Sequence, residues 1–86
     1  MITITTESGG QYEFDTEQNL YRKSSTTQTS KVGLTPWRRC DLVQMFDEVS
    51  RETVKPSGIV PGKRLYISST QFWNITSNVT KVETTA

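Results

Sequence analysis

The stretch ITITTESGGQYEFD, from Ile2 to Asp15, predicts a β-hairpin, because two segments of alternating apolar and polar residues flank a pair of glycines. A two-residue turn at Gly9-Gly10 would divide the apolar side chains between the two faces of the hairpin. A three-residue loop from Ser8 to Gly10 places Ile4 opposite Phe14 and gathers the apolar side chains on one face. We therefore expect the three-residue loop.

Further strands are expected on both sides of the middle of the chain. Leu20 to Lys23 predicts a third strand, with Leu20 paired against Phe14. Near the C-terminus, alternation predicts a second hairpin whose three-residue loop, Ser69 to Gln71, places Ile67 opposite Trp73. After it, Val79 continues the inward alternation but Val82 breaks it, which predicts either a β-bulge near Lys81 or a strand that ends there.

The segment 41–51 has two interpretations. Its apolar residues follow helical spacing at i, i+3, i+4 and i+7, and Asp41 stands where an N-cap belongs; these apolar residues are Leu42, Met45, Phe46 and Val49. The other interpretation is a strand that continues from Trp37 to Phe46, because a helix this short depends on tertiary packing. We favour the helix here, and we expect a type II turn at Val60 to Lys63.

These elements predict one small β-rich domain over residues 1–86. We expect an antiparallel β-barrel or roll of about five to six strands, built from the two hairpins and including the short helix over 41–51. Residues 24–35 are expected to form a polar flexible loop, because their first part, Ser24 to Ser30, contains no apolar residue to anchor it.

Composition argues against most kinds of catalytic or metal site. The chain has no histidine and one cysteine, Cys40, which excludes an internal disulfide and the usual Cys/His zinc sites. We expect Cys40 to be a half-buried structural residue, no cofactor or metal, and no enzymatic activity. The N-terminus lacks a signal-peptide pattern and no segment resembles a membrane span, so we expect a protein of a reducing, intracellular compartment that does not bind membranes.

Charge is distributed unevenly although the net charge is only +1. Residues 1–20 carry four acids and no base, whereas residues 21–40 carry five bases and no acid. Aromatic residues accompany these bases, and both kinds of side chain are common in binding surfaces. The predicted binding residues are Tyr21, Arg22, Lys23, Lys31, Trp37, Arg38 and Arg39.

Several segments of the chain resemble small accessory proteins of actinobacterial phages, a family of unknown function. The similarity rests on ITTESGGQYEFD near the N-terminus, Trp37, the segment Val60 to Leu65 and the segment Ile75 to Glu83. Members of the family usually have proline where this chain has Asn78. The resemblance implies a phage protein that acts in the host cytoplasm, and it assigns no functional residue.

The expected function is therefore binding without catalysis. The basic and aromatic cluster is predicted to dock on a host or defence protein and to modulate it. Two alternatives are a small nucleic-acid-binding protein and a minor component of the virion. Opposed acidic and basic faces also favour a homo-oligomer.

Overall fold

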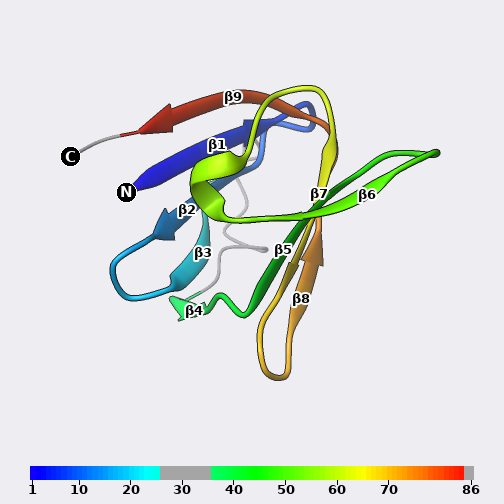
Figure 1. The fold of residues 1–86 in the computed structure, drawn as a ribbon. Coiled ribbons are helices and arrows are strands. Elements are labelled where there is room, and N and C mark those ends of the chain that lie inside the picture. The colour runs from blue at the N-terminus through cyan, green and yellow to red at the C-terminus, as the bar shows by residue number, and fades with distance from the viewer. Residues whose placement is uncertain (26–35, 85–86) are drawn as a thin grey trace.

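The computed structural model describes residues 1–25 and 36–84, and for residues 24 and 25 it describes the backbone only. In this part of the chain, nine strands form two antiparallel sheets (Figure 1). The described residues include one turn of 3-10 helix, η1 (Pro56–Gly58), and no α-helix. No helix in these ranges has the length and apolar character to cross a membrane.

The first sheet has five strands, and the two ends of the described chain lie beside each other in it. Ile2 in the first strand pairs with Thr84 in the last, and Figure 1 shows the start of β1 and the end of β9 on the same side of the molecule. In spatial order the strands are β4 (Arg38–Arg39), β3 (Leu20–Ser25), β2 (Gln11–Asp15), β1 (Ile2–Thr6) and β9 (Val79–Thr84).

The second sheet has four strands and is formed entirely by the middle of the chain. Its two central strands come from different hairpins and pair with each other, so the sheet joins both hairpins. In spatial order the strands are β6 (Arg51–Val54), β5 (Leu42–Phe46), β7 (Arg64–Ser68) and β8 (Trp73–Ile75).

One hydrophobic core lies on the inner faces of both sheets. Burial alternates along the strands, so that every second residue of β1, β2, β5 and β7 is buried. The buried apolar residues are Ile2, Ile4, Tyr12, Phe14, Tyr21, Val43, Met45, Ile59, Leu65, Ile67 and Val79. Cys40, Val54 and Val82 pack against this core with partial exposure.

The first hairpin has the single apolar face that its alternation predicts, but its register differs from the prediction by two residues. Ile4 pairs with Tyr12 and not with Phe14. The three-residue loop is Glu7 to Gly9, and it is closed by the N–H of Thr6, which donates to the carbonyl of Gly10 at 3.0 Å. Gly9 has a φ of 87°, so the glycine that accepts a left-handed conformation is the third loop residue.

The third strand is present, but it exposes the opposite set of residues from the one predicted. Phe14 pairs with Tyr21, and Leu20 pairs with Asp15. Asn19, at the end of the β2–β3 turn, has a φ of 56° and shifts the pairing by one position. Tyr21 is consequently fully buried, whereas Leu20 is partly exposed.

The second hairpin differs from its prediction in loop length. The N–H of Ser69 donates to the carbonyl of Phe72 at 2.7 Å, so the loop between this pair has two residues, Thr70 and Gln71, and not three. Trp73 therefore pairs with Ser68, and Ile67 pairs with Asn74. Because side chains alternate between faces, this shift of one residue places Trp73 and Ile75 on the solvent side of the sheet.

The helix predicted over 41–51 is wrong, because this segment forms β5, a turn and the start of β6. The carboxylate of Asp47 accepts hydrogen bonds from the N–H groups of Val49 and Ser50, at 2.9 and 2.8 Å, and these bonds hold the pKa of the carboxyl below its usual value. Val49, which helical spacing would bury, is 92% exposed. Pairing with both β6 and β7 stabilises the strand over the short helix.

The expectation of a closed barrel is also wrong: in the described part of the chain, the sheets remain two separate sheets with free edges. Nine strands replace the predicted five to six. The predicted polar loop 24–35 falls on the end of β3 and on residues 26–35, which lie outside the described residues. The bulge expected near Lys81 is confirmed, since Thr5 pairs with Lys81 and Thr6 with Val79, leaving Thr80 as the extra residue.

The turn at Val60 to Lys63 provides a test of backbone conformation. Gly62 has a φ of 112°, and a methyl group there would meet no atom within 4 Å, so backbone strain is the main cost of a side chain. We expect Gly62→Ala to lower the free energy of unfolding by about 1 to 2 kcal/mol in urea denaturation. Gly58→Ala is the control, because φ at Gly58 is not positive and an added methyl makes ordinary contact with Val54. Equal losses in both variants would contradict this interpretation.

Tyr21 links the two sheets, and this link can be tested. Its hydroxyl donates to the amide oxygen of Asn74 in β8 at 3.0 Å. We expect Tyr21→Phe to lower the free energy of unfolding by about 1 kcal/mol, because the partly buried oxygen of Asn74 loses its donor. Tyr66→Phe should lower the free energy of unfolding by less, since the Tyr66 hydroxyl has no hydrogen-bond partner among the described residues. Chemical denaturation of the two variants gives the comparison.

Candidate binding surface

The basic and aromatic residues predicted to form one cluster are divided between the two faces of the five-stranded sheet. On the outer face, the guanidinium of Arg22 lies 4.5 Å from the centre of the Trp37 ring. Arg22 also forms an ion pair of 2.8 Å with Glu13, which is directly opposite it on β2. Arg39 forms an exposed ion pair of 2.9 Å with Asp41.

The other predicted residues do not join that group. Tyr21 is fully buried in the core, and burial raises the pKa of its hydroxyl. Arg38 pairs with Tyr21 across the strands, and its guanidinium lies 3.9 Å from the ring centre of Phe72. Lys23 lies 5.9 Å from the ring centre of Tyr12, and Lys31 falls outside the described residues. Tyr21 therefore belongs to the core, and a binding role for the remaining residues stays a prediction.

A different surface carries three aromatic side chains, of which Trp73 is exposed and Phe46 and Tyr66 are partly exposed. The inner face of the four-stranded sheet contributes to the core, and its outer face is at least partly exposed to solvent. We call this outer side the aromatic face; its residues are Leu42, Gln44 and Phe46 of β5, Arg51 and Thr53 of β6, Arg64, Tyr66 and Ser68 of β7, and Trp73 and Ile75 of β8.

Strand register determines the contacts on the aromatic face. Phe46 on β5 has Arg51 directly opposite on one side and Arg64 directly opposite on the other. Both guanidinium groups lie 5.3 Å from the centre of the Phe46 ring. Such contacts are favourable because a cation is attracted to the negative face of an aromatic ring.

The aromatic rings follow a diagonal across three strands. Tyr66 and Trp73 are diagonal neighbours on β7 and β8, and their rings are stacked with centroids 6.4 Å apart and planes inclined by 21°. The guanidinium of Arg51 also lies 5.9 Å from the Tyr66 ring centre. Trp73 is 60% exposed and Ile75 is 46% exposed, so the end of the diagonal on β8 is the most accessible part.

The aromatic face is positively charged. None of its residues carries a carboxylate, and neither Arg51 nor Arg64 forms an ion pair with another described residue. Asp47, in the adjacent turn, is paired with Lys63 at 3.7 Å. The contacts of the two guanidinium groups are with neutral partners, namely aromatic rings and, for Arg64, the carbonyl of Thr76, which accepts a hydrogen bond of 2.9 Å.

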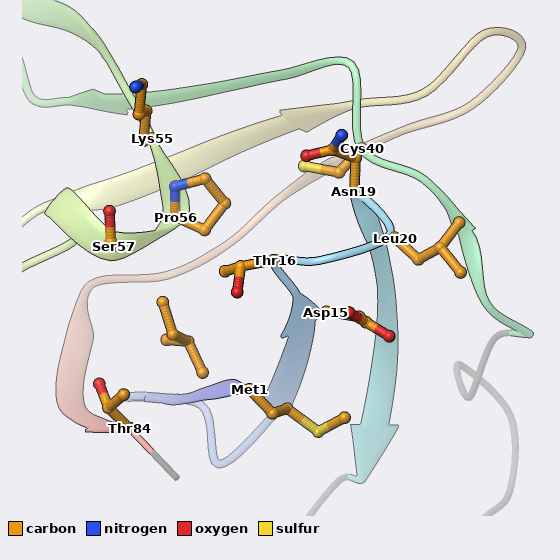
Figure 2. Close-up of a pocket in the computed structure, with 11 residues that line it drawn as sticks. Met1, Asp15, Thr16, Asn19, Leu20, Cys40, Lys55, Pro56, Ser57 and Thr84 are labelled. Atoms are coloured by element: carbon orange, nitrogen blue, oxygen red, sulfur yellow. The ribbon is translucent and has the colours of Figure 1, made fainter. Parts of the chain in front are cut away.

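A cavity of about 550 Å³ lies where strands of the five-stranded sheet meet η1 (Figure 2). Figure 2 shows Met1 and Thr84 on one side of the opening and Lys55, Pro56 and Ser57 on the other. The remaining lining residues are Ile2, Asp15, Thr16, Asn19, Leu20 and Cys40.

The reactive groups of this cavity have structural roles. The carboxylate of Asp15 accepts hydrogen bonds from the N–H groups of Glu17 and Gln18, both at 3.1 Å, and so stabilises the β2–β3 turn. Burial, with a smaller effect from Asp41, raises the pKa of the Cys40 thiol to about 11. The thiol is therefore protonated at neutral pH, which agrees with the half-buried structural cysteine expected from the sequence.

The aromatic face was missed by sequence reasoning because the loop before Trp73 was assigned the wrong length. Three loop residues would have buried Trp73 and Ile75, whereas the observed two expose both. One signal was available: Phe46, Arg64 and Tyr66 alternate with the buried residues of their strands.

Comparisons with known proteins give no relative. No protein-family model matches the chain, no curated protein matches it, and no solved structure matches it. In the part of the chain that the structure describes, no group of three or more His, Cys, Asp or Glu side chains is arranged to hold a metal ion.

The raised pKa of Cys40 leads to a pH-dependent prediction. At pH 8 we expect alkylation by iodoacetamide to be about a hundredfold slower than for a cysteine with the ordinary pKa of 9.0, because the thiolate population falls in that proportion. The folded protein favours the protonated thiol, so this contribution to stability is complete below pH 9 and is lost as the pH rises through 11. Labelling measured by mass spectrometry, with the protein unfolded in urea as control, provides the test. Rapid labelling of the folded protein at pH 8 would contradict it.

Proposed function

We propose that this chain is a non-catalytic binding protein that recognises a protein partner through the aromatic face. The observation that carries the proposal is the combination of three aromatic rings and two arginines, without any carboxylate, on one exposed side of a sheet. Tryptophan, tyrosine and arginine are the residues that most often dominate the energy of protein interfaces. Trp73, Tyr66 and Arg51 supply all three here.

The composition of the face favours a protein over a nucleic acid as the partner. Interfaces with nucleic acids are strongly basic, whereas this face has two positive charges and the whole chain has a net charge of +1. Both guanidinium groups lie 5.3 Å from the centre of the Phe46 ring, so they form part of a mixed apolar and basic surface. Ile75 adds an exposed aliphatic side chain, which suits an apolar contact.

The chemistry of the face indicates the kind of partner surface that would fit. An apolar centre would cover Trp73 and Ile75, and carboxylates near its margin would meet Arg51 and Arg64. Guanidinium groups that already lie on aromatic rings lose less conformational freedom when they bind a carboxylate. The partner we propose is therefore a protein with an apolar patch bordered by acidic residues.

The setting of this interaction is also a proposal. The resemblance of several segments to small accessory proteins of actinobacterial phages supports a partner in the bacterial host cytoplasm, either a host protein or a defence protein. In this view the chain modulates its partner by covering a surface. A structural role in the virion is the competing view, and detection of the chain in purified particles would support it.

A second candidate function is binding of single-stranded nucleic acid. The specific observation in its favour is the diagonal of Phe46, Tyr66 and Trp73 across neighbouring strands, because exposed rings on a sheet can stack on successive bases. Stacking on the exposed ring of Trp73 would contribute about 1 to 3 kcal/mol per base. An affinity that falls steeply with salt concentration distinguishes this function from the first.

The proposal is tested by affinity capture from host lysate with nuclease present, followed by titration of the captured protein. We expect Trp73→Ala to weaken binding by at least about 2 kcal/mol, or roughly thirtyfold, because it removes the most exposed ring of the face. Arg51→Glu should also weaken binding, because it places a carboxylate opposite the acidic margin of the partner. Both variants should remain folded, since both side chains are exposed.

The matched control is Arg39→Glu, which makes the same reversal of charge at an exposed arginine on the other sheet. Retained binding in this control, together with loss in Arg51→Glu, supports the aromatic face. If Arg39→Glu abolished binding and Trp73→Ala left it unchanged, the proposal would be overturned, and the cluster predicted from the sequence would be the binding site. Capture that disappears with nuclease would favour the nucleic-acid function instead.

A further inference from the structure

We propose that β9 is a dimerisation strand, which pairs antiparallel with β9 of a second copy of this chain. This inference is independent of the proposed function, because β9 belongs to the other sheet. β9 is the last strand in the order β4-β3-β2-β1-β9, so one of its edges has no neighbouring strand among the described residues. An unpaired edge presents main-chain donors and acceptors that can bind another strand.

The free part of this edge begins after Val79. The N–H of Val79 donates to the carbonyl of Lys63, and its carbonyl accepts from the N–H of Gly62, both at 2.9 Å. These bonds occupy the first position of the strand. The following segment, Thr80 to Thr84, has no such cover from the described residues.

Main-chain direction can be followed along the strands. In β1 the N–H of Thr6 donates toward β2, and successive residues of an antiparallel strand alternate in direction. The main-chain N–H and C=O groups of Thr5 and Thr3 therefore point toward β9, where these residues pair with Lys81 and Glu83. This alternation leaves the N–H and C=O groups of Val82 and Thr84 on the free edge.

The sequence of this edge, Thr80-Lys81-Val82-Glu83-Thr84, is complementary to itself. When two copies pair antiparallel about a two-fold axis at Val82, valine lies opposite valine and threonine lies opposite threonine. Lys81 of each copy then lies opposite Glu83 of the other. Directly opposed side chains share one face of a sheet, so the two pairs of Lys81 and Glu83 are attractive.

The charged side chains of β9 are exposed, so a second copy of the chain can reach them. Lys81 and Glu83 are 65% and 50% exposed, and they already form an ion pair of 3.2 Å along the strand. In the dimer the four charges would alternate in sign around the two-fold axis. Val82, on the opposite side of the strand, already packs against the core and would meet its own copy there.

A lysine on an edge strand ordinarily prevents association, because it would lie opposite an unmatched residue of a foreign strand. Here Lys81 discourages foreign strands but is matched in a second copy of β9. The exposed edge of β6 lacks this property: a two-fold axis at Glu52 would place two glutamates opposite each other. Strands β4 and β8 are only two and three residues long. The β9 edge is therefore the one we assign to dimerisation.

Reversal of the charges tests the proposed register. In Lys81→Glu each new carboxylate would face Glu83 of the other copy, and in Glu83→Lys two lysines would face each other. We expect either substitution to raise the dimer dissociation constant tenfold or more, as measured by sedimentation velocity over a concentration series. Circular dichroism should show that both variants keep the fold, because both side chains are exposed.

Two further samples separate a register-specific interface from a general effect of charge. The double variant Lys81→Glu/Glu83→Lys restores opposite charges and should dimerise like the original chain. An equimolar mixture of the two single variants should form a heterodimer, because glutamates in one chain then face lysines in the other. Raising the salt concentration should weaken the original dimer.

The outcomes that would overturn the proposal are distinct. A chain that remains monomeric up to about 1 mM, which corresponds to a binding free energy of only about 4 kcal/mol, has no such interface. A dimer that persists unchanged in both single variants uses another surface. Failure of the double variant to restore a dimer lost in the single variants would rule out the register about Val82.

Discussion

The hydrophobic core that both sheets share is the constraint on which their arrangement depends, and the hydrogen bond from the Tyr21 hydroxyl to Asn74 is a polar link across it. Tyr21 is fully buried and stacks on Phe14, so its hydroxyl needs a partner inside the protein. Asn74 meets that need only by facing the inner side of β8. Since side chains alternate, its neighbours Trp73 and Ile75 must then face solvent. The register that brings Asn74 to the Tyr21 hydroxyl therefore also exposes a tryptophan on the opposite side of the strand.

Much of the strand pattern could be predicted from the sequence, because alternation needs no knowledge of distant residues. The apolar face of the first hairpin and the bulge beside Lys81 both followed from it. Register could not be predicted in the same way, because it depends on how many residues form each loop. After Ser69 the difference between three and two loop residues reversed the face of the next strand. At Gly9 the position of one left-handed residue moved the pairing by two.

The segment 41–51 and the binding surface required tertiary information. Residues 42–46 showed helical spacing and no regular strand alternation, and only pairing with β6 and β7 makes the segment a strand. The aromatic face combines residues from four strands, so no local pattern identifies it. The basic residues predicted as one cluster were neighbours in sequence, yet consecutive strand residues point to opposite faces. Arg22 is consequently separated from Tyr21 by the sheet itself.

The pairing of β1 with β9 affects how the protein reaches its native state. Ile4 pairs with Val82, and nearly the whole described chain separates these two residues in sequence. By contrast, β1, β2 and β3 form a meander of local contacts. Contacts between distant residues carry a larger entropic cost of loop closure and generally form late. We therefore expect the meander to form first and β9 to join it last. The edge that β9 contributes would exist only in chains that have finished folding, so incomplete molecules would not present it.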